Sequence, residues 1–311
     1  MFRSPLAIII PSLFATACME QNLIGAGLDA PPPGDHYFAQ ALARAPHVSL
    51  DAGLTHTCGI LDGFISCWGS SEEDANWGTI SNAPQDGGWL TLEAGYWTTC
   101  ALNVDGNIVC WGREVLDSPL TLDAMNRRGL SDFALGTSGG LGLRRDGSLD
   151  SWGSDVWGQV SDAPDGSFID VEAGYGWACA IEDTGQLWCW GDDVIVDDAP
   201  YAQTFASLRR GSDTLCGITT EGDARCWGGS TGMSGQPAMA ISPSGSLTCA
   251  LDDDGAIECS GAFDEAATVQ QPQNDGWEAL ACGHYHCCVQ KGPEDVCWGV
   301  EALGALEGWR P

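Results

Sequence analysis

A pair of cysteines nine or ten residues apart, with a turn between them, recurs six times and constrains the fold more than any other feature. The pairs are Cys58 and Cys67, Cys100 and Cys110, Cys179 and Cys189, Cys216 and Cys226, Cys249 and Cys259, and Cys288 and Cys297. A seventh copy, residues 141–151, lacks both cysteines but keeps the turn Asp146-Gly147 and the following Trp152-Gly153. Successive copies start 33 to 42 residues apart, which predicts a radial or solenoidal repeat protein.

A short run of alternating apolar residues precedes each copy, and all but one of these runs end in glycine. The runs are residues 47–53, 89–95, 130–136, 168–174, 205–211, 238–244 and 277–283, and the exception ends in Ser244. Alternation over so short a span predicts a β-strand rather than a helix.

The segment between each pair of cysteines predicts a β-hairpin. In residues 58–67, a two-residue Asp62-Gly63 turn would pair residue 61 with residue 64, so that Cys58 lies opposite Cys67. In residues 100–110, a three-residue loop ending in a left-handed Gly106 would place Cys100 opposite Cys110. Both spacings bring the two sulfurs within disulfide distance. Zinc ligands usually lie two to four residues apart, so we favour hairpin disulfides over zinc sites and over buried free thiols.

Several further motifs accompany the cysteines. They are the strand ends Ala52-Gly53, Ala94-Gly95 and Ala173-Gly174, the pairs Thr57-Cys58 and Thr99-Cys100, the Asp-Gly turns and the Cys-Trp-Gly segments. With these motifs the repeat resembles the regulator of chromosome condensation family, in the short cysteine-bearing form of bacterial secreted proteins. His56 and His286 match a histidine that this family often carries. The resemblance implies an all-β, seven-bladed β-propeller of short antiparallel blades over residues 46–311.

The charge of the chain argues against the role of the family's namesake, a nucleotide exchange factor that sits on chromatin. The formal net charge is −31, and Lys291 is the only lysine. Such a surface repels nucleic acid, so we expect no nucleic-acid partner. It favours a basic protein partner instead. Guanine nucleotide exchange is therefore not the expected activity.

The N-terminal residues predict export. Residues 1–18 combine one arginine, a short apolar run and the sequence Ala15-Thr16-Ala17-Cys18, as in a secretory signal. Cys18 resembles the lipid-accepting cysteine of a bacterial lipoprotein, although Ala15-Thr16-Ala17 also suits ordinary cleavage and secretion. Residues 19–45 would form a flexible tether. We expect an outer-membrane or cell-surface lipoprotein that contacts the membrane only through its lipid, with plain secretion as the alternative.

We find no catalytic motif among the histidines, serines and acidic residues, so we expect neither an enzyme nor a cofactor. The segment from Cys282 to Cys288 leaves two interpretations open. Its two histidines and two additional thiols could bind zinc or copper. Alternatively, Cys288 pairs with Cys297, as in the sister repeats, and Cys282 bridges Cys287. We favour the disulfide and expect no metal.

The loops after the strand-end glycines should share one face of the propeller, and they carry most of the candidate binding residues. The candidates are Tyr96, Trp97, Tyr175, Trp177, His284, Tyr285 and His286, with Trp77 and Trp157 from longer loops as weaker candidates. Tyrosine and tryptophan dominate binding hot spots. The alternative is that these rings only fill space between blades. The tryptophans that follow the hairpins recur at one fixed position and should be core: Trp68, Trp111, Trp152, Trp190, Trp227 and Trp298.

These patterns together predict a non-catalytic binding platform at the cell envelope. Recognition of a protein by one loop face is the leading hypothesis. The first alternative is a glycan-binding module in which the tryptophans and tyrosines stack on sugar rings. The second is a structural envelope component without a soluble ligand.

Overall fold

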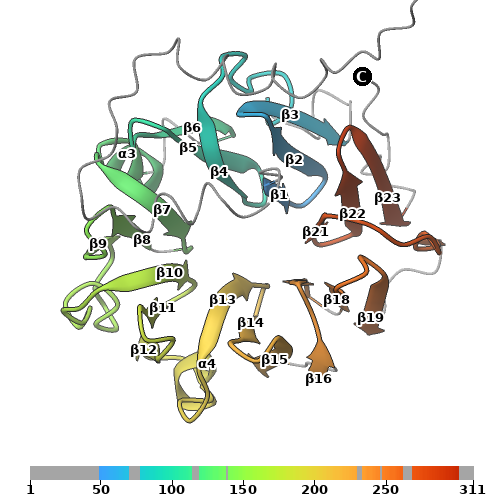
Figure 1. Ribbon diagram of the computed structural model, residues 1–311. Coiled ribbons are helices and arrows are strands. Elements are labelled where there is room, and N and C mark those ends of the chain that lie inside the picture. Colours follow the sequence, from blue (N-terminus) through green and yellow to red (C-terminus); the bar gives the residue numbers. More distant parts are fainter. Residues whose placement is uncertain are drawn as a thin grey trace, which may run out of the picture. The chain divides into compact units, whose positions relative to one another are not determined.

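The computed structural model describes residues 49–69, 78–113, 119–137, 139–229, 233–245, 247–261 and 268–300. These residues form seven antiparallel sheets of three or four strands, arranged around a ring as a seven-bladed β-propeller (Figure 1). The all-β fold class expected from the repeats is thereby confirmed. No helix in the described part of the chain is long and apolar enough to span a membrane.

Each blade is built from consecutive strands of the chain. The first three blades are β1 (Ser49–Ala52), β2 (His56–Leu61) and β3 (Phe64–Gly69); β4 (Trp89–Ala94), β5 (Thr98–Asn103) and β6 (Ile108–Gly112); and β7 (Leu130–Leu135), β8 (Gly139–Arg144) and β9 (Leu149–Gly153). The fourth and fifth are β10 (Phe168–Ala173), β11 (Trp177–Glu182) and β12 (Leu187–Gly191); and β13 (Phe205–Arg210), β14 (Thr214–Thr219), β15 (Asp223–Gly228) and β16 (Ser234–Pro237). The last two are β17 (Ala240–Pro243), β18 (Leu247–Leu251) and β19 (Ile257–Gly261); and β21 (Ala279–Cys282), β22 (His286–Lys291) and β23 (Glu294–Val300), with β20 (Thr268–Val269) beside β23. Two short helices, α3 (Pro119–Met125) and α4 (Val194–Asp197), lie between blades in the chain.

The hairpin registers agree with the sequence prediction. Leu61 pairs with Phe64 across the turn, and both Asp62 and Gly63 have positive φ, as a type I′ turn requires. Six disulfides join cysteines that lie directly opposite each other on the second and third strands of a blade: Cys58–Cys67, Cys100–Cys110, Cys179–Cys189, Cys216–Cys226, Cys249–Cys259 and Cys288–Cys297. In the third blade, Leu141 and Ser151 occupy the equivalent register.

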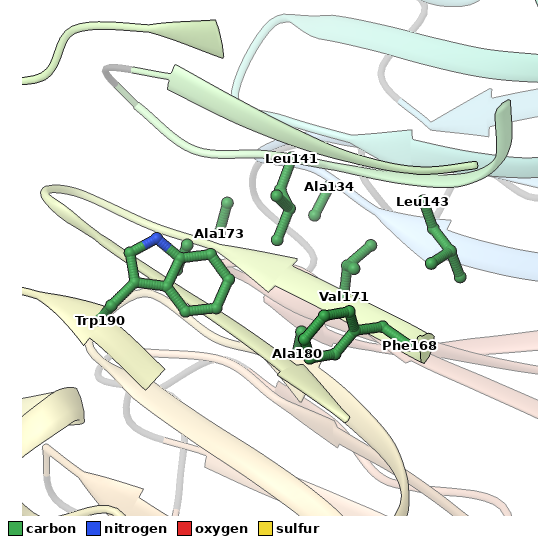
Figure 2. Packing of buried hydrophobic residues seen from close by; sticks show 9 residues of the cluster. Ala134, Leu141, Leu143, Phe168, Val171, Ala173, Ala180 and Trp190 are labelled. Atoms are coloured by element: carbon green, nitrogen blue, oxygen red, sulfur yellow. The ribbon is translucent and has the colours of Figure 1, made fainter. Parts of the chain in front are cut away.

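The apolar core lies between the blades rather than at the centre of the ring. Figure 2 shows one of these clusters, in which Leu141 and Leu143 of the third blade pack against Phe168 and Val171 of the fourth. The tryptophans predicted as core are all buried. Three of them donate their indole N–H to a backbone carbonyl 31 or 32 residues earlier, namely Trp111 to Thr79, Trp190 to Gln159 and Trp227 to Ile195. Each of these indole groups therefore fixes its blade to the connecting segment that precedes that blade.

The first and seventh blades meet without exchanging a strand among the described residues, since β1 pairs only with β2. Polar side chains hold this junction. Buried His286 bonds Thr57, the Trp68 indole N–H donates to Cys297 Sγ, and buried Gln290 lies against Gly59. The described residues of the other six junctions form apolar clusters.

Candidate functional site

A cavity of about 330 Å³ lies at the centre of the ring. Residues of the innermost strand of every blade line it: β1, β4, β7, β10, β13, β17 and β21. The first residues of the following loops line it too, among them Tyr96, Thr137, Ser212 and His284. The cavity therefore reaches the face of the propeller on which the candidate binding loops lie.

Charge is distributed unevenly around this cavity. Five carboxyl groups come from the first four blades, and two arginines from the fifth. They are Asp51, Glu93, Asp132, Asp170, Glu172, Arg209 and Arg210. The sixth and seventh blades contribute small side chains such as Ser242, Pro243 and Cys282. The wall is thus acidic along the first four blades, basic at the fifth, and lined by small side chains at the sixth and seventh.

Three of the carboxylates connect neighbouring blades. Asp51 accepts a hydrogen bond from the backbone N–H of Ala94 at 2.6 Å, and Glu93 accepts one from Leu135 at 2.8 Å. Asp170 accepts from Leu208 at 2.7 Å. Each bond runs from the inner strand of one blade to the inner strand of the next. Because each satisfies a backbone donor at the edge of the cavity, these three acids have a structural role.

Glu172 and Asp132 are less completely bonded. The side chain of Glu172 is only 8% exposed, and it makes no hydrogen bond to the described residues. Its nearest cationic atom is Arg210 Nε at 4.0 Å, beyond hydrogen-bond distance, and that nitrogen has no hydrogen-bond partner either. Among the same described residues, Asp132 accepts only from the N–H of its neighbour Phe133. These two carboxyl groups retain acceptor capacity toward the cavity.

Burial favours the neutral form of the cavity acids. It raises the pKa of Glu172 to about 7, against the opposing effects of Arg210 and Arg209. Burial and the nearby Asp170 carboxylate raise the pKa of Asp132 to about 7 as well. The pKa values of Asp51, Glu93 and Asp170 are also raised by burial. A cation that entered the cavity would lower these pKa values again, because it would stabilise the charged carboxylates.

Tyr96 and His284 line the cavity, and the rings of Trp97 and Tyr285 lie next to them. We call these four side chains the aromatic rim. Tyr96 is 56% and Trp97 37% exposed. The ring centroids of Tyr96 and His284 lie 6.0 Å apart, and those of His284 and Tyr285 lie 4.5 Å apart. The guanidinium of Arg113 lies 5.1 Å from the Trp97 ring. Loops of the second and seventh blades thus meet in one exposed cluster.

Two other candidates lie outside the aromatic rim, namely Tyr175 on the fourth blade and Trp157 in the loop before that blade. Tyr175 is 58% exposed, and its ring centroid lies 5.0 Å from that of half-buried Trp157. They form a second aromatic pair, in which Tyr175 is the exposed ring. Trp77 and Cys18 lie outside the described residues.

Two of the predicted binding residues are buried and so cannot form an exposed face. Trp177 packs in the core between the fourth and fifth blades, and His286 bonds Thr57. Both are the first residue of the second strand of a blade, where the side chain turns inward. The residues one and two positions after the strand-end glycine, such as Tyr96 and Trp97, face outward instead.

The cysteine-rich segment is fully oxidised. Cys282 bridges Cys287, and Cys288 bridges Cys297. The Sγ atoms of Cys249, Cys282 and Cys287 lie within 4.8 Å of one another, as the only such group of three potential metal ligands in the described residues. Each of the three sulfurs is in a disulfide, which removes the thiolate that a metal needs.

The acidic cavity is the part of the site that the sequence interpretation missed. Asp51, Glu93 and Glu172 each stand two residues before a strand-end glycine, and Arg209 occupies the same position in the fifth blade. Aligning the repeats on that glycine would have revealed the charged position.

The comparisons with known proteins bear on the fold. The chain is similar to the CRINKLY WD40 ectodomain of the Arabidopsis thaliana receptor kinase ACR4, with 22% identity and a TM-score of 0.65 over 83% of this chain and 95% of that one. It is also similar to the ectodomain of the Physcomitrella patens receptor kinase CR4, with 23% identity and a TM-score of 0.63 over 81% of this chain and 73% of that one. No family model matches the chain. This likeness establishes a β-propeller.

Proposed function

We propose that this propeller is a non-catalytic binding platform that recognises another protein with the face carrying the aromatic rim. The observation that carries the proposal is the exposure of Tyr96 and Trp97 beside a cavity. Large exposed rings at a concave site are typical of binding hot spots, since they bury much area with few rotatable bonds. Propellers in general serve as interaction platforms.

The proposed setting is the cell envelope. Seven disulfides are typical of proteins that mature in an oxidising compartment outside the cytoplasm. Together with the sequence of residues 1–18, they support export. Lipidation at Cys18, a tether over residues 19–45 and a propeller domain over residues 46–311 complete the proposal. Membership of the regulator of chromosome condensation family is proposed on the repeat motifs, without exchange activity.

The test is affinity capture from envelope and secreted fractions, followed by mass spectrometry. The baits are the full chain and its Tyr96→Ala/Trp97→Ala variant. Trp188→Ala is the matched control, because Trp188 is an exposed tryptophan on β12, away from the aromatic rim. We expect one protein to be retained by the parent and the control and lost by the double variant. Equal capture by all three baits would refute recognition by the rim.

Glycan binding is a second candidate because of the pair of half-buried Trp157 and exposed Tyr175, whose rings could stack on a sugar. It predicts weak binding that persists at high salt, whereas the protein complex should be salt-sensitive. Trp157→Ala/Tyr175→Ala would abolish sugar binding while leaving the rim-dependent complex unchanged. A structural envelope component would instead self-assemble, which analytical ultracentrifugation of the purified chain would reveal.

A further inference from the structure

We infer that the central cavity receives a basic side chain, a lysine or arginine of the partner, which enters past Tyr96 and His284 and lies against Glu172. This inference rests on the proposed recognition of a protein by the rim face. It adds the chemistry of the group that the partner inserts.

The route into the cavity is part of the geometry. Tyr96 is largely exposed and at the same time lines the cavity, as does His284. A side chain protruding from a partner docked on the rim would therefore meet aromatic rings first and carboxyl groups below them. Aromatic faces attract cations when these lie within about 6 Å of the ring centroid. A volume of about 330 Å³ suits one extended side chain rather than a folded segment.

Glu172 provides the anionic contact. It is more than nine-tenths buried, lines the cavity, makes no hydrogen bond to any residue that the structure describes, and lies 4.0 Å from Arg210 Nε. A buried carboxylate without a hydrogen-bond donor is costly, so a donor from outside the chain would be strongly favoured there. The acceptor capacity left on Asp132 adds to the acidic side.

The charge balance selects a cation over an anion. Five carboxyl groups line the cavity against two arginines. Both arginines lie close enough to the acids to influence their pKa values, so their charge is already partly compensated. An anion would have to approach past the carboxyl groups, whereas a cation would relieve their mutual repulsion.

The test uses an acetylated peptide with three lysines separated by glycines, and the same peptide with norleucine in place of lysine. Binding to the full chain is measured by isothermal titration calorimetry at pH 8 and moderate salt. The key variant is Glu172→Gln, which keeps the side-chain shape and breaks no hydrogen bond in the described residues. Glu258→Gln is the matched control, since Glu258 is exposed on β19 and its side chain has no hydrogen-bond partner among the described residues. Thermal melts confirm that both variants fold.

We expect the lysine peptide to bind, Glu172→Gln to weaken it about tenfold, and Glu258→Gln to change it less than about twofold. Equal weakening by both variants, or equal binding of the norleucine peptide, would overturn the inference. So would saturable Ca²⁺ binding that requires Glu172 in the absence of peptide binding. If capture by the rim persists in Glu172→Gln while the lysine peptide does not bind, only the cavity inference fails. If Tyr96→Ala/Trp97→Ala also leaves capture unchanged, the proposed function fails with it.

Discussion

His286 Nε2 lies 2.6 Å from Thr57 Oγ1, across the junction that joins the seventh blade to the first. His56 makes the same bond one junction further on, to Thr99 at 2.7 Å. All four side chains are buried. The histidine that resembles a family motif thus connects neighbouring blades.

Thr57→Val should destabilise the ring. The change keeps the side-chain shape but leaves buried His286 without its bond, and its other ring nitrogen already has no hydrogen-bond partner in the described part of the chain. We expect a loss of about 1–3 kcal/mol in the free energy of unfolding, measured by urea titration. Thr204→Val is the control, because Thr204 bonds Thr220 on the exposed surface and should cost less than about 0.5 kcal/mol. Equal losses from the two variants would show that the bond between Thr57 and His286 does not stabilise the fold.

Gly53→Ala should be costly for a different reason. A Cβ at Gly53 would collide with the backbone carbonyl oxygen of Gly95 in the next blade, and one at Gly283 would collide with that of Gly53. The strand-end glycines therefore allow neighbouring blades to approach closely. We expect a loss of about 1–3 kcal/mol by thermal or urea unfolding. Gly245→Ala makes only ordinary contacts and should be neutral; a neutral Gly53→Ala would contradict the close approach.

Leu141→Cys/Ser151→Cys should form an eighth disulfide. The two residues lie opposite each other in β8 and β9, in the register that the cysteines occupy in the other blades. Closing a loop of this length stabilises by roughly 2–3 kcal/mol in the chain-entropy model, from which the lost packing of buried Leu141 subtracts. Peptide mapping without reduction tests the bond, and Leu141→Ala/Ser151→Ala is the thiol-free control. Alkylation of both new cysteines in the folded protein would refute the register.

Asp132→Asn should alter how stability depends on pH. The pKa of Asp132 is about 7 in the folded protein and 3.8 as its ordinary value, so the folded state binds the extra proton between these values. Stability from this group is therefore lost as pH rises from about 4 to 7. The charged groups facing it are Asp170 on β10 and Arg209 on β13. We therefore compare the free energy of unfolding of the variant with that of the parent. The difference, variant minus parent, should be higher at pH 8 than at pH 4 by about 1 kcal/mol or more.

The buried histidines make stability depend on pH in the opposite direction, so the variant must be compared with the parent at each pH. Burial lowers the pKa of His56 to about 4 and of His286 to about 3, so their contribution is lost as pH falls below about 6.5. Both proteins share this effect, and it cancels in the difference. Asp105→Asn, at an exposed turn, is the control. A difference that does not change with pH would show that Asp132 ionises normally.

The hairpins could be predicted from the sequence because their register is local. A turn of known length fixes which cysteines face each other, as Asp62-Gly63 does for Cys58 and Cys67. The direction of a side chain at a strand boundary is not local. His284 and His286 stand two residues apart, yet one is exposed and the other buried, because β22 begins at His286.

The cavity could not be predicted because it exists only when seven inner strands converge. Asp51 and Asp170 belong to different repeats, and each bonds the blade that follows it. In the sequence they resemble the polar positions of ordinary half-buried strands. Only the assembled ring places them around a common space.

The hairpin disulfides have a mechanical consequence. Each described disulfide closes a loop inside one blade, and none joins two blades. Under tension the ring can therefore open between blades, while each locked hairpin withholds nine or ten residues from extension. That is about 30–35 Å of chain per hairpin at roughly 3.3–3.6 Å per residue. A stretched molecule would lengthen in short steps, and adding a reductant would make each of those steps longer.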